Sequence, residues 1–159
     1  MDHLWSPWRY QYVTKAHSAA PVPCIFCEKP KGTDEESLIV HRGEYNFVLL
    51  NLYPYTNGHL MIAPYEHVAT LQGAAEATLL EMMKLTKHAE GILWQLYKPE
   101  GINLGMNLGE CAGAGVAGHI HMHLLPRWMG DASFMSVIGE TRVLPETLDT
   151  TWRRITAAW

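Results

Sequence analysis

The sequence lacks the features that would place it in a membrane or outside the cell. No stretch approaches the ~18 uninterrupted apolar residues of a membrane-spanning helix. The first ten residues, MDHLWSPWRY, lack the basic-then-apolar order of a signal peptide. Three cysteines are too few for a secreted disulfide framework, and an odd count fits a reducing compartment better. We therefore expect a soluble, cytoplasmic protein with no membrane partner.

Runs of basic residues are also missing. The chain has 12 Lys and Arg against 16 Asp and Glu, which gives a net charge of −4. Proteins that bind duplex nucleic acid neutralise its phosphates with clustered Lys and Arg. No duplex nucleic-acid partner is expected.

The chain does have enough apolar residues for one core, because 48% of its 159 residues are hydrophobic. The patterning predicts strands at 38–42, 45–51, 59–63, 102–108, 119–125 and 134–138, and helices at 74–97 and 145–158. We divide the chain into an aromatic N-terminal arm (1–23), a core (24–140) and a C-terminal helical segment (141–159). The expected fold is a single α+β domain with an antiparallel sheet of about five strands, a long helix and a C-terminal helix.

Histidine is unusually frequent, with nine copies in the chain. Three of them, His119, His121 and His123, alternate with apolar residues. In a strand, alternate side chains share a face, so the three imidazoles would lie together. Three interpretations remain open: a solvated polar face, a three-histidine metal site, and a nucleophilic or acid–base cluster. We favour the last, because alternate residues are ~6.6 Å apart along a strand and the outer two cannot easily share one ion.

A glycine-rich segment, residues 109–118, directly precedes these histidines. Glycines allow backbone N–H groups to approach an anion closely, although a plain connecting turn has the same composition. Next to three histidines, the segment suggests a phosphate held against an imidazole.

The run His119-Ile-His-Met-His-Leu-Leu125 resembles the signature of the histidine-triad (HIT) family. The segments 48–63, 101–109 and 126–134 are similar to those of bacterial HIT proteins described as diadenosine tetraphosphate phosphorylases. The resemblance covers roughly residues 38 to 140. It implies a HIT-like fold, joined across a homodimer through the long helix and an edge strand.

The resemblance also implies a chemistry. HIT enzymes cleave a nucleotide at its α-phosphate through a covalent nucleotidyl-histidine, and the middle histidine, here His121, is the nucleophile. It needs one unprotonated nitrogen, with its other N–H bonded to an acceptor such as a backbone carbonyl. His123 would donate to phosphate or leaving oxygens, and His59 would support the site.

The substrate-binding residues follow from the same resemblance. Backbone N–H groups of Ala114, Gly115 and Val116 would cradle phosphate, Asn51 would bind the ribose and Asn107 the phosphate side. Trp128 follows the histidine strand closely enough to stack on a base or close the pocket. Each asparagine also has a purely structural alternative, in which it caps a strand end or satisfies a turn.

The implied substrate is a dinucleoside polyphosphate such as diadenosine tetraphosphate. An adenosine phosphoramidase and a nucleotide-binding module with negligible turnover are the alternatives. Related enzymes carry a Ser or Thr where this chain has Ala114-Gly115. Because that hydroxyl contacts the leaving phosphate or the acceptor, the second-step acceptor is left open between water and inorganic phosphate.

Cys24-x-x-Cys27 predicts either two reduced core thiols or half of a zinc site; no βαβ context supports a thioredoxin-like use. Many bacterial HIT proteins bind structural zinc with such a pair and histidines that match His67 and His119. The resemblance therefore implies a closed Zn²⁺ site of Cys24, Cys27, His67 and His119. The first histidine of the triad then leaves catalysis and joins the metal.

Overall fold

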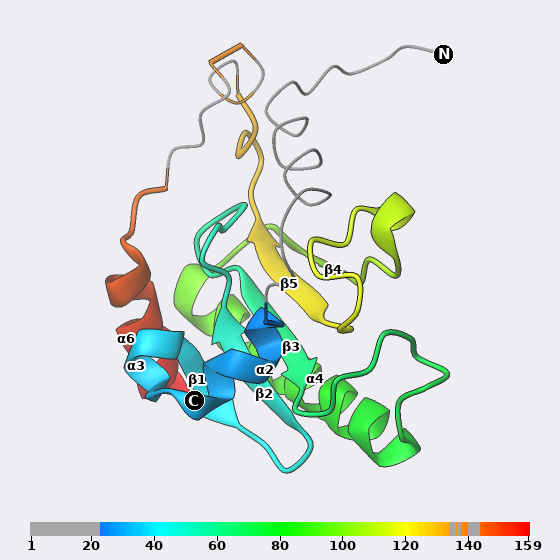
Figure 1. The fold of residues 1–159 in the computed structure, drawn as a ribbon. Helices are drawn as coiled ribbons and strands as arrows, with labels where there is room; N and C mark the ends of the chain where they lie inside the picture. Colours follow the sequence, from blue (N-terminus) through cyan, green and yellow to red (C-terminus); the bar gives the residue numbers. More distant parts are fainter. Residues whose placement is uncertain (1–22, 134–135, 137, 140–143) are drawn as a thin grey trace.

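Five antiparallel strands form one sheet in the order β1-β2-β3-β5-β4 (Figure 1). The computed structural model describes residues 23–133, 136, 138–139 and 144–159. Their strands are β1 (Ile39–Arg42), β2 (Asn46–Leu50), β3 (Leu60–Pro64), β4 (Gly101–Gly105) and β5 (Met122–Arg127). The helices are α2 (Ile25–Glu28), α3 (Asp34–Ser37), α4 (Glu76–Tyr97) and α6 (Leu148–Ala158), with 3₁₀ turns η1 (Lys29–Lys31) and η2 (Glu110–Ala112). The predicted α+β architecture is confirmed. The predicted arm lies almost wholly outside the described residues, as does most of the expected strand at 134–138.

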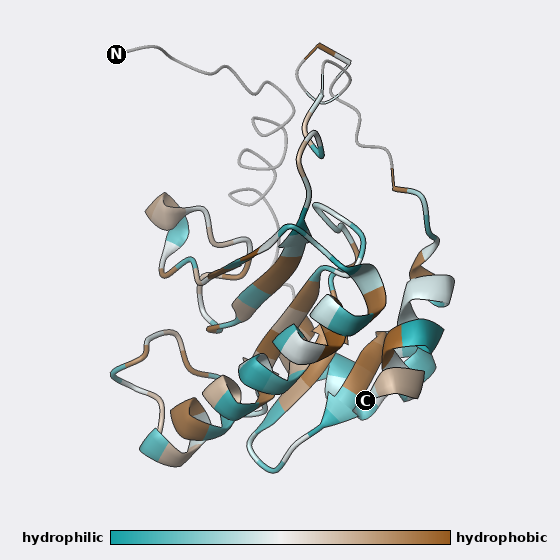
Figure 2. Ribbon diagram, turned by 180° about the vertical axis from the view of Figure 1, so that it is seen from behind, coloured by the Kyte–Doolittle hydropathy of each residue, from teal (hydrophilic) through white to brown (hydrophobic). Residues whose placement is uncertain are grey.

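Helix α4 covers one face of the sheet, and Figure 2 shows it in front of the strands. Its buried residues fall at the helical spacing that the sequence predicts, and they pack against the apolar side chains of β2, β3 and β5. The cluster comprises Val40, Val48, Leu50, Leu60, Ile62, Met82, Ala89, Ile92, Leu93, Ile120, Leu124 and Ile155. Among the described helices, none is both long and apolar enough to cross a bilayer.

The opposite face carries a smaller cluster beneath α2. Phe26 of α2 packs with Ile39, Phe47, Leu49, Met61 and Ala63. Met61 pairs with His123 across β3 and β5, so His123 also lies on this face. The histidines and the cysteine-bearing helix therefore share one side of the sheet, while α4 supports the other.

The start of the histidine strand corrects the prediction. The strand was expected to begin at His119, but β5 begins only at Met122. The N–H of Ile120 donates to the carbonyl of Val68 at 2.8 Å, which bonds this segment to the loop after β3 rather than to the ladder. The alternation itself persists, because Ile120 and Leu124 lie in the core beneath α4.

The C-terminal helix also begins later than expected. Neither the segment boundary at 141 nor Pro145 marks its start: residues 141–143 lie outside the description, and α6 begins at Leu148. Thr147 is the N-cap, since its side chain accepts the N–H of Thr150 at 3.2 Å. The nearby Glu146 carboxylate binds Arg154 and the Tyr97 hydroxyl, which fixes the approach to α6.

A carboxylate from α4 holds the turn between β1 and β2. Glu81 accepts the backbone N–H groups of Glu44, Tyr45 and Asn46 at 2.7–2.8 Å, and also the side-chain amide of Asn46. Burial opposes ionisation of Glu81, but these hydrogen bonds outweigh it and lower its pKa. The contact ties the long helix to the sheet.

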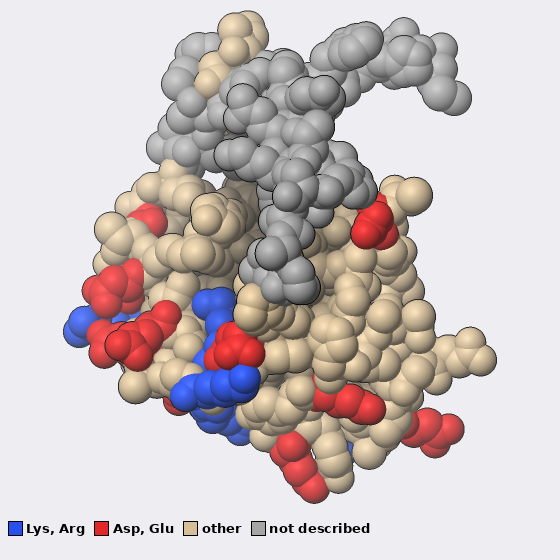
Figure 3. Space-filling view, in the orientation of Figure 1, with Lys and Arg blue, Asp and Glu red and all other residues tan. Residues whose placement is uncertain are grey.

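Charges of both signs are interleaved on the face that carries α2 and α3, as Figure 3 shows. Arg42 pairs with Asp34 at 2.7 Å, and Lys31 pairs with Glu28 at 2.6 Å. The basic side chains in these pairs are therefore locally balanced by acids.

Candidate functional site

Two thiols and two imidazoles converge beside the sheet. The candidate ligand atoms of Cys24, Cys27, His67 and His119 all lie within 4.8 Å of one another. Cys24 Sγ is 3.4 Å from His119 Nδ1, and Cys27 Sγ is 3.3 Å from His67 Nδ1. The four residues come from α2, from the loop after β3 and from the segment before β5. The fold thus brings together the set that the sequence suggested.

This geometry fits zinc. Zn–S bonds of about 2.3 Å and Zn–N bonds of about 2.0–2.1 Å give tetrahedral edges of about 3.6 Å between S and N. The third sulfur–nitrogen separation, Cys27 Sγ to His119 Nδ1, is 3.7 Å. His119 Nε2 donates to the Pro64 carbonyl at 2.9 Å, which leaves Nδ1 unprotonated and aimed at the thiols. Four protein ligands would fill the coordination shell.

His121, the expected nucleophile, is held as a single tautomer. Its Nδ1 lies 2.9 Å from the carbonyl oxygen of His119 and must donate to it. Nε2 therefore has the lone pair when the ring is neutral. Burial lowers the pKa of His121 against the opposing effect of that hydrogen bond, which favours the neutral ring. The sequence predicted a carbonyl acceptor of this kind.

His123 is ordered by a chain of hydrogen bonds that starts at the backbone. The N–H of Tyr55 donates to His59 Nδ1 at 3.1 Å, so His59 has its proton on Nε2. That Nε2–H donates to His123 Nδ1 at 2.9 Å. His123 therefore has its own proton on Nε2. Burial and the neighbouring His121 lower the pKa of His123 to about 4, so it is a neutral donor at pH 7.

Phe26 lies between the candidate metal ligands and His121, the expected nucleophile. Its ring centroid is 4.6 Å from that of His121 and 5.3 Å from that of His119, and the side chain is only 1% exposed. It lies between the two cysteines in the sequence. The sequence analysis assigned no role to Phe26, although its position inside the Cys-x-x-Cys motif could have indicated one. A metal on the cysteines would thus also fix the packing behind His121.

The glycine-rich segment forms a loop in which two glycines have positive φ. Gly109 has φ +85°, and Gly113, which ends η2, has φ +89°. The N–H of Ala114 donates to the Gly109 carbonyl at 3.3 Å and closes the loop. Within the described part of the chain, the N–H groups of Gly115 and Val116 have no backbone partner. These two remain the better candidates for an anion cradle.

Both candidate asparagines make structural contacts. Asn51 Oδ1 accepts the N–H of Tyr53 at 3.0 Å, and its Nδ2 lies 3.4 Å from His59 Nδ1. Asn107 Nδ2 donates to the Gly113 carbonyl at 3.4 Å. Each asparagine therefore braces a loop beside the histidines.

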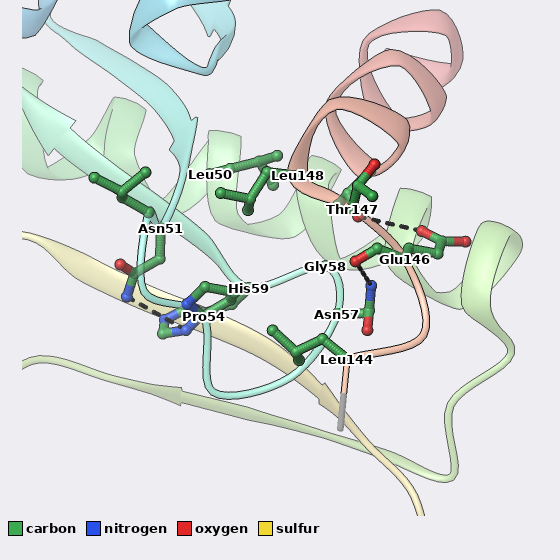
Figure 4. A pocket seen from close by; sticks show the side chains of 12 residues that line it. Leu50, Asn51, Pro54, Asn57, Gly58, His59, Leu144, Glu146, Thr147 and Leu148 are labelled. Carbon is green, nitrogen blue, oxygen red and sulfur yellow. Dashed lines mark hydrogen bonds between the residues drawn. The ribbon is translucent and has the colours of Figure 1, made fainter. Parts of the chain in front are cut away.

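Two cavities flank the loop that connects β2 to β3. A cavity of about 250 Å³ lies between this loop and α6, with Asn51 and His59 in its wall (Figure 4). A cleft of about 660 Å³ lies against Tyr55, Tyr97 and Trp128. Tyr55 lines this cleft and also contacts the histidines. Its ring centroid is 4.7 Å from that of His59, with the two rings tilted, and its ring stacks on that of His123 with the centroids 6.2 Å apart.

Comparisons with known proteins agree with this arrangement. The model of the HIT domain family matches residues 33–129. The chain is 39% identical to an AP-4-A phosphorylase of Mycobacterium tuberculosis, over 100% of this chain and 85% of that protein. A Zn-bound histidine triad family protein from Mycobacterium smegmatis superposes with a TM-score of 0.69 and 25% identity, covering 86% of this chain and 92% of that one. A hypothetical histidine triad nucleotide-binding protein from Sulfolobus tokodaii superposes with a TM-score of 0.68 and 26% identity, covering 85% of this chain and 91% of that one.

Proposed function

Because the chain belongs to the HIT domain family, we propose that it is a nucleotidyltransferase that cleaves dinucleoside polyphosphates such as diadenosine tetraphosphate. The observation that carries this proposal is the pair of ordered imidazoles. His121 presents a lone pair on Nε2, and His123 beside it presents an N–H. The 39% identity to an AP-4-A phosphorylase supports the substrate class and favours inorganic phosphate as the acceptor.

In the first step, the Nε2 lone pair of His121 attacks the α-phosphorus. An N–P bond forms, and the bond from phosphorus to the bridging oxygen breaks, so that ATP leaves with the electron pair. The ring gains positive charge, which the His119 carbonyl stabilises through the Nδ1–H bond of 2.9 Å. His123 Nε2–H donates to the oxygens where negative charge develops.

In the second step, an oxygen of inorganic phosphate attacks the same phosphorus. The N–P bond breaks, its electron pair returns to His121 Nε2, and ADP is released. The nucleophile is restored as the tautomer in which it began, because the hydrogen bond to the His119 carbonyl keeps the proton on His121 Nδ1 throughout. Water in place of phosphate would give AMP.

The remaining site residues bind the substrate. N–H groups of Gly115 and Val116 would contact phosphate oxygens, with Ala114 shaping the loop. Asn51 would bind ribose hydroxyls and Asn107 the phosphate chain, in addition to bracing their loops.

Cys24, Cys27, His67 and His119 would hold a structural zinc ion. Zinc bound there would supply stability, since no open position is left for a substrate. By anchoring the His119 side chain, bound zinc would also restrain the segment whose carbonyl orients His121. Thiolate ligands suit a reducing compartment, so we place the protein in the cytoplasm.

A homodimer would cover apolar surface at the sheet edge. Leu104 of the edge strand β4 is 51% exposed, and Leu80, Met83 and Trp94 of α4 are also exposed. Strand edges and apolar helix surface of this kind are commonly buried between subunits. Light scattering of the purified protein should give twice the mass of the 17.9 kDa chain.

The product pair tests the function. The protein is incubated with diadenosine tetraphosphate with and without inorganic phosphate, and the nucleotides are separated. Phosphorolysis gives ADP and ATP, whereas AMP and ATP would show hydrolysis. Binding without products would favour a sensor, and cleavage of adenosine phosphoramidate alone would show a phosphoramidase. His121→Ala should abolish turnover while the circular dichroism spectrum is retained.

A further inference from the structure

The four residues after β5 form a turn that is closed by one carboxylate. Asp131 accepts the Nε–H of Arg127 at 2.5 Å and the Nη2–H at 2.8 Å, so the pair is bidentate. Its Oδ2 also accepts the backbone N–H of Trp128 at 3.2 Å. The N–H of Asp131 in turn donates to the Trp128 carbonyl at 3.1 Å. The backbone on both sides of Trp128 is thereby held by Asp131.

This turn is anchored to the edge of the sheet as well. Arg127 Nη1 donates to Asn103 Oδ1 of β4 at 2.6 Å. Glu100, just before β4, accepts the N–H of Met129. The Asp131 side chain is only 12% exposed, although that of Arg127 is 43% exposed. The bidentate contact therefore holds the Asp131 carboxylate in one orientation.

The turn forms one wall of the cleft of about 660 Å³. Trp128 and Asp131 lie on this wall, and Tyr55 lies on the wall toward the histidines. Since the Tyr55 ring stacks on the ring of His123 at 6.2 Å, the cleft begins one aromatic ring away from the reacting imidazoles. A group that leaves from a phosphorus at His121 would pass this ring and reach the cleft.

We propose that Asp131 is a positioning residue, which with Arg127 holds Trp128 where it stacks on the base of the second nucleoside, the one that departs with the leaving group. This proposal rests on the proposed function, because it assigns a place to the second half of a dinucleotide. An aromatic wall suits this ligand, since every base presents a π-face that stacks without sequence readout. The two carboxylates of the cleft do not repel a polyphosphate strongly, because Asp131 is paired with Arg127 and Glu146 with Arg154.

The test compares two substrates that share the first nucleotide. Diadenosine tetraphosphate has the second base, whereas adenosine 5′-phosphofluoridate releases only fluoride. The ratio of their kcat/KM values isolates recognition of the leaving half. We expect Trp128→Ala to lower this ratio about tenfold, as the loss of one base–aromatic stack does. Asp131→Ala should lower the ratio by a similar factor, and the loss should appear as a higher KM for diadenosine tetraphosphate rather than a lower kcat.

The double variant separates positioning from an independent role. If Asp131 acts through Trp128, the Trp128→Ala/Asp131→Ala protein should lose no more than Trp128→Ala alone. Trp128→Phe should regain most of the ratio. The matched control is Asp149→Ala, which breaks the other i,i+4 Arg–Asp pair, Arg153–Asp149, on α6. It should leave the ratio at the wild-type value.

Each of the following outcomes would overturn the inference. A wild-type ratio in Asp131→Ala, or additive losses of about a hundredfold in the double variant, would show that Asp131 does not act through Trp128. Equal losses with both substrates would show a general structural role. Cleavage of the fluoridate but not of diadenosine tetraphosphate by the wild-type protein would instead refute the proposed function, and the subsite with it.

Discussion

Replacement of His59 by leucine should slow catalysis without removing the nucleophile. His59 is 1% exposed, and it connects the Tyr55 N–H to His123 Nδ1 through bonds of 3.1 and 2.9 Å. Leucine has about the same bulk but neither accepts nor donates. The Nδ1 atom of His123 would lose its donor, and the imidazole could then hold its proton on either nitrogen. Only the Nε2–H form is poised to donate to the substrate.

The expected magnitude follows from that single bond. A neutral hydrogen bond contributes about 1 kcal/mol, and a buried acceptor left without a partner costs about 1–3 kcal/mol. A loss of about 2 kcal/mol in the transition state corresponds to about a thirtyfold decrease in kcat. His59→Gln should lose less, because one amide can both accept from Tyr55 and donate to His123.

The assay is steady-state cleavage of diadenosine tetraphosphate, combined with a thermal melt of each variant. His88→Leu is the control, since His88 is an exposed histidine of α4 that contacts Trp159 rather than the site. It should keep the wild-type kcat. If His59→Leu lowers the melting temperature but keeps kcat, the hydrogen-bond chain does not order His123 and our reasoning is refuted.

Three further predictions concern metal, stability and pH. Cys24→Ser should lower zinc content and melting temperature together, as measured by elemental analysis and calorimetry; unchanged zinc content would remove the metal site from the account. Glu81→Ala should destabilise the fold by about 3 kcal/mol, or roughly 9 °C for a domain of this size, because several hydrogen bonds to a charged group are lost. A melting temperature near the wild-type value would show that the turn between β1 and β2 does not need this carboxylate. Because the pKa of His123 is lowered to about 4, the folded state takes up its proton only below that pH, while the unfolded chain takes it up near 6.5. Stability should therefore decrease as pH falls from about 6.5 toward 4, and His123→Asn should make that slope shallower in denaturant titrations. Burial also lowers the pKa values of His119 and His121, so these two residues should keep part of the slope.

Local patterns were sufficient for most of the fold. The helix at 74–97 and the first three strands were placed within two residues of α4, β1, β2 and β3, because apolar spacing reports directly which face is buried. The two wrong starts have different causes. Ile120 bonds to the loop after β3, a tertiary contact that no window of neighbouring residues shows. The start of α6 was misplaced because Pro145 was read as its first turn, whereas Thr147 caps the helix through the nearby N–H of Thr150.

The site divides in the same way. The candidate metal ligands, which the structure brings together, and the two proposed catalytic histidines could be named from the resemblance. The tautomers could not, because they depend on a backbone N–H at Tyr55 and on carbonyls at Pro64 and His119. The role of Asp131 also escaped the sequence, since an Arg and an Asp four residues apart predict a pair only once the turn between them is known.

The central claim is that His121 briefly carries the nucleotide, and trapping that adduct tests it most directly. The protein is mixed with diadenosine tetraphosphate labelled at the α-phosphorus, quenched in alkaline denaturant, which preserves N–P bonds, and digested for peptide mapping. We predict label on His121 alone and none in His121→Ala. Label on another residue, or turnover by His121→Ala at the wild-type rate, would contradict the account.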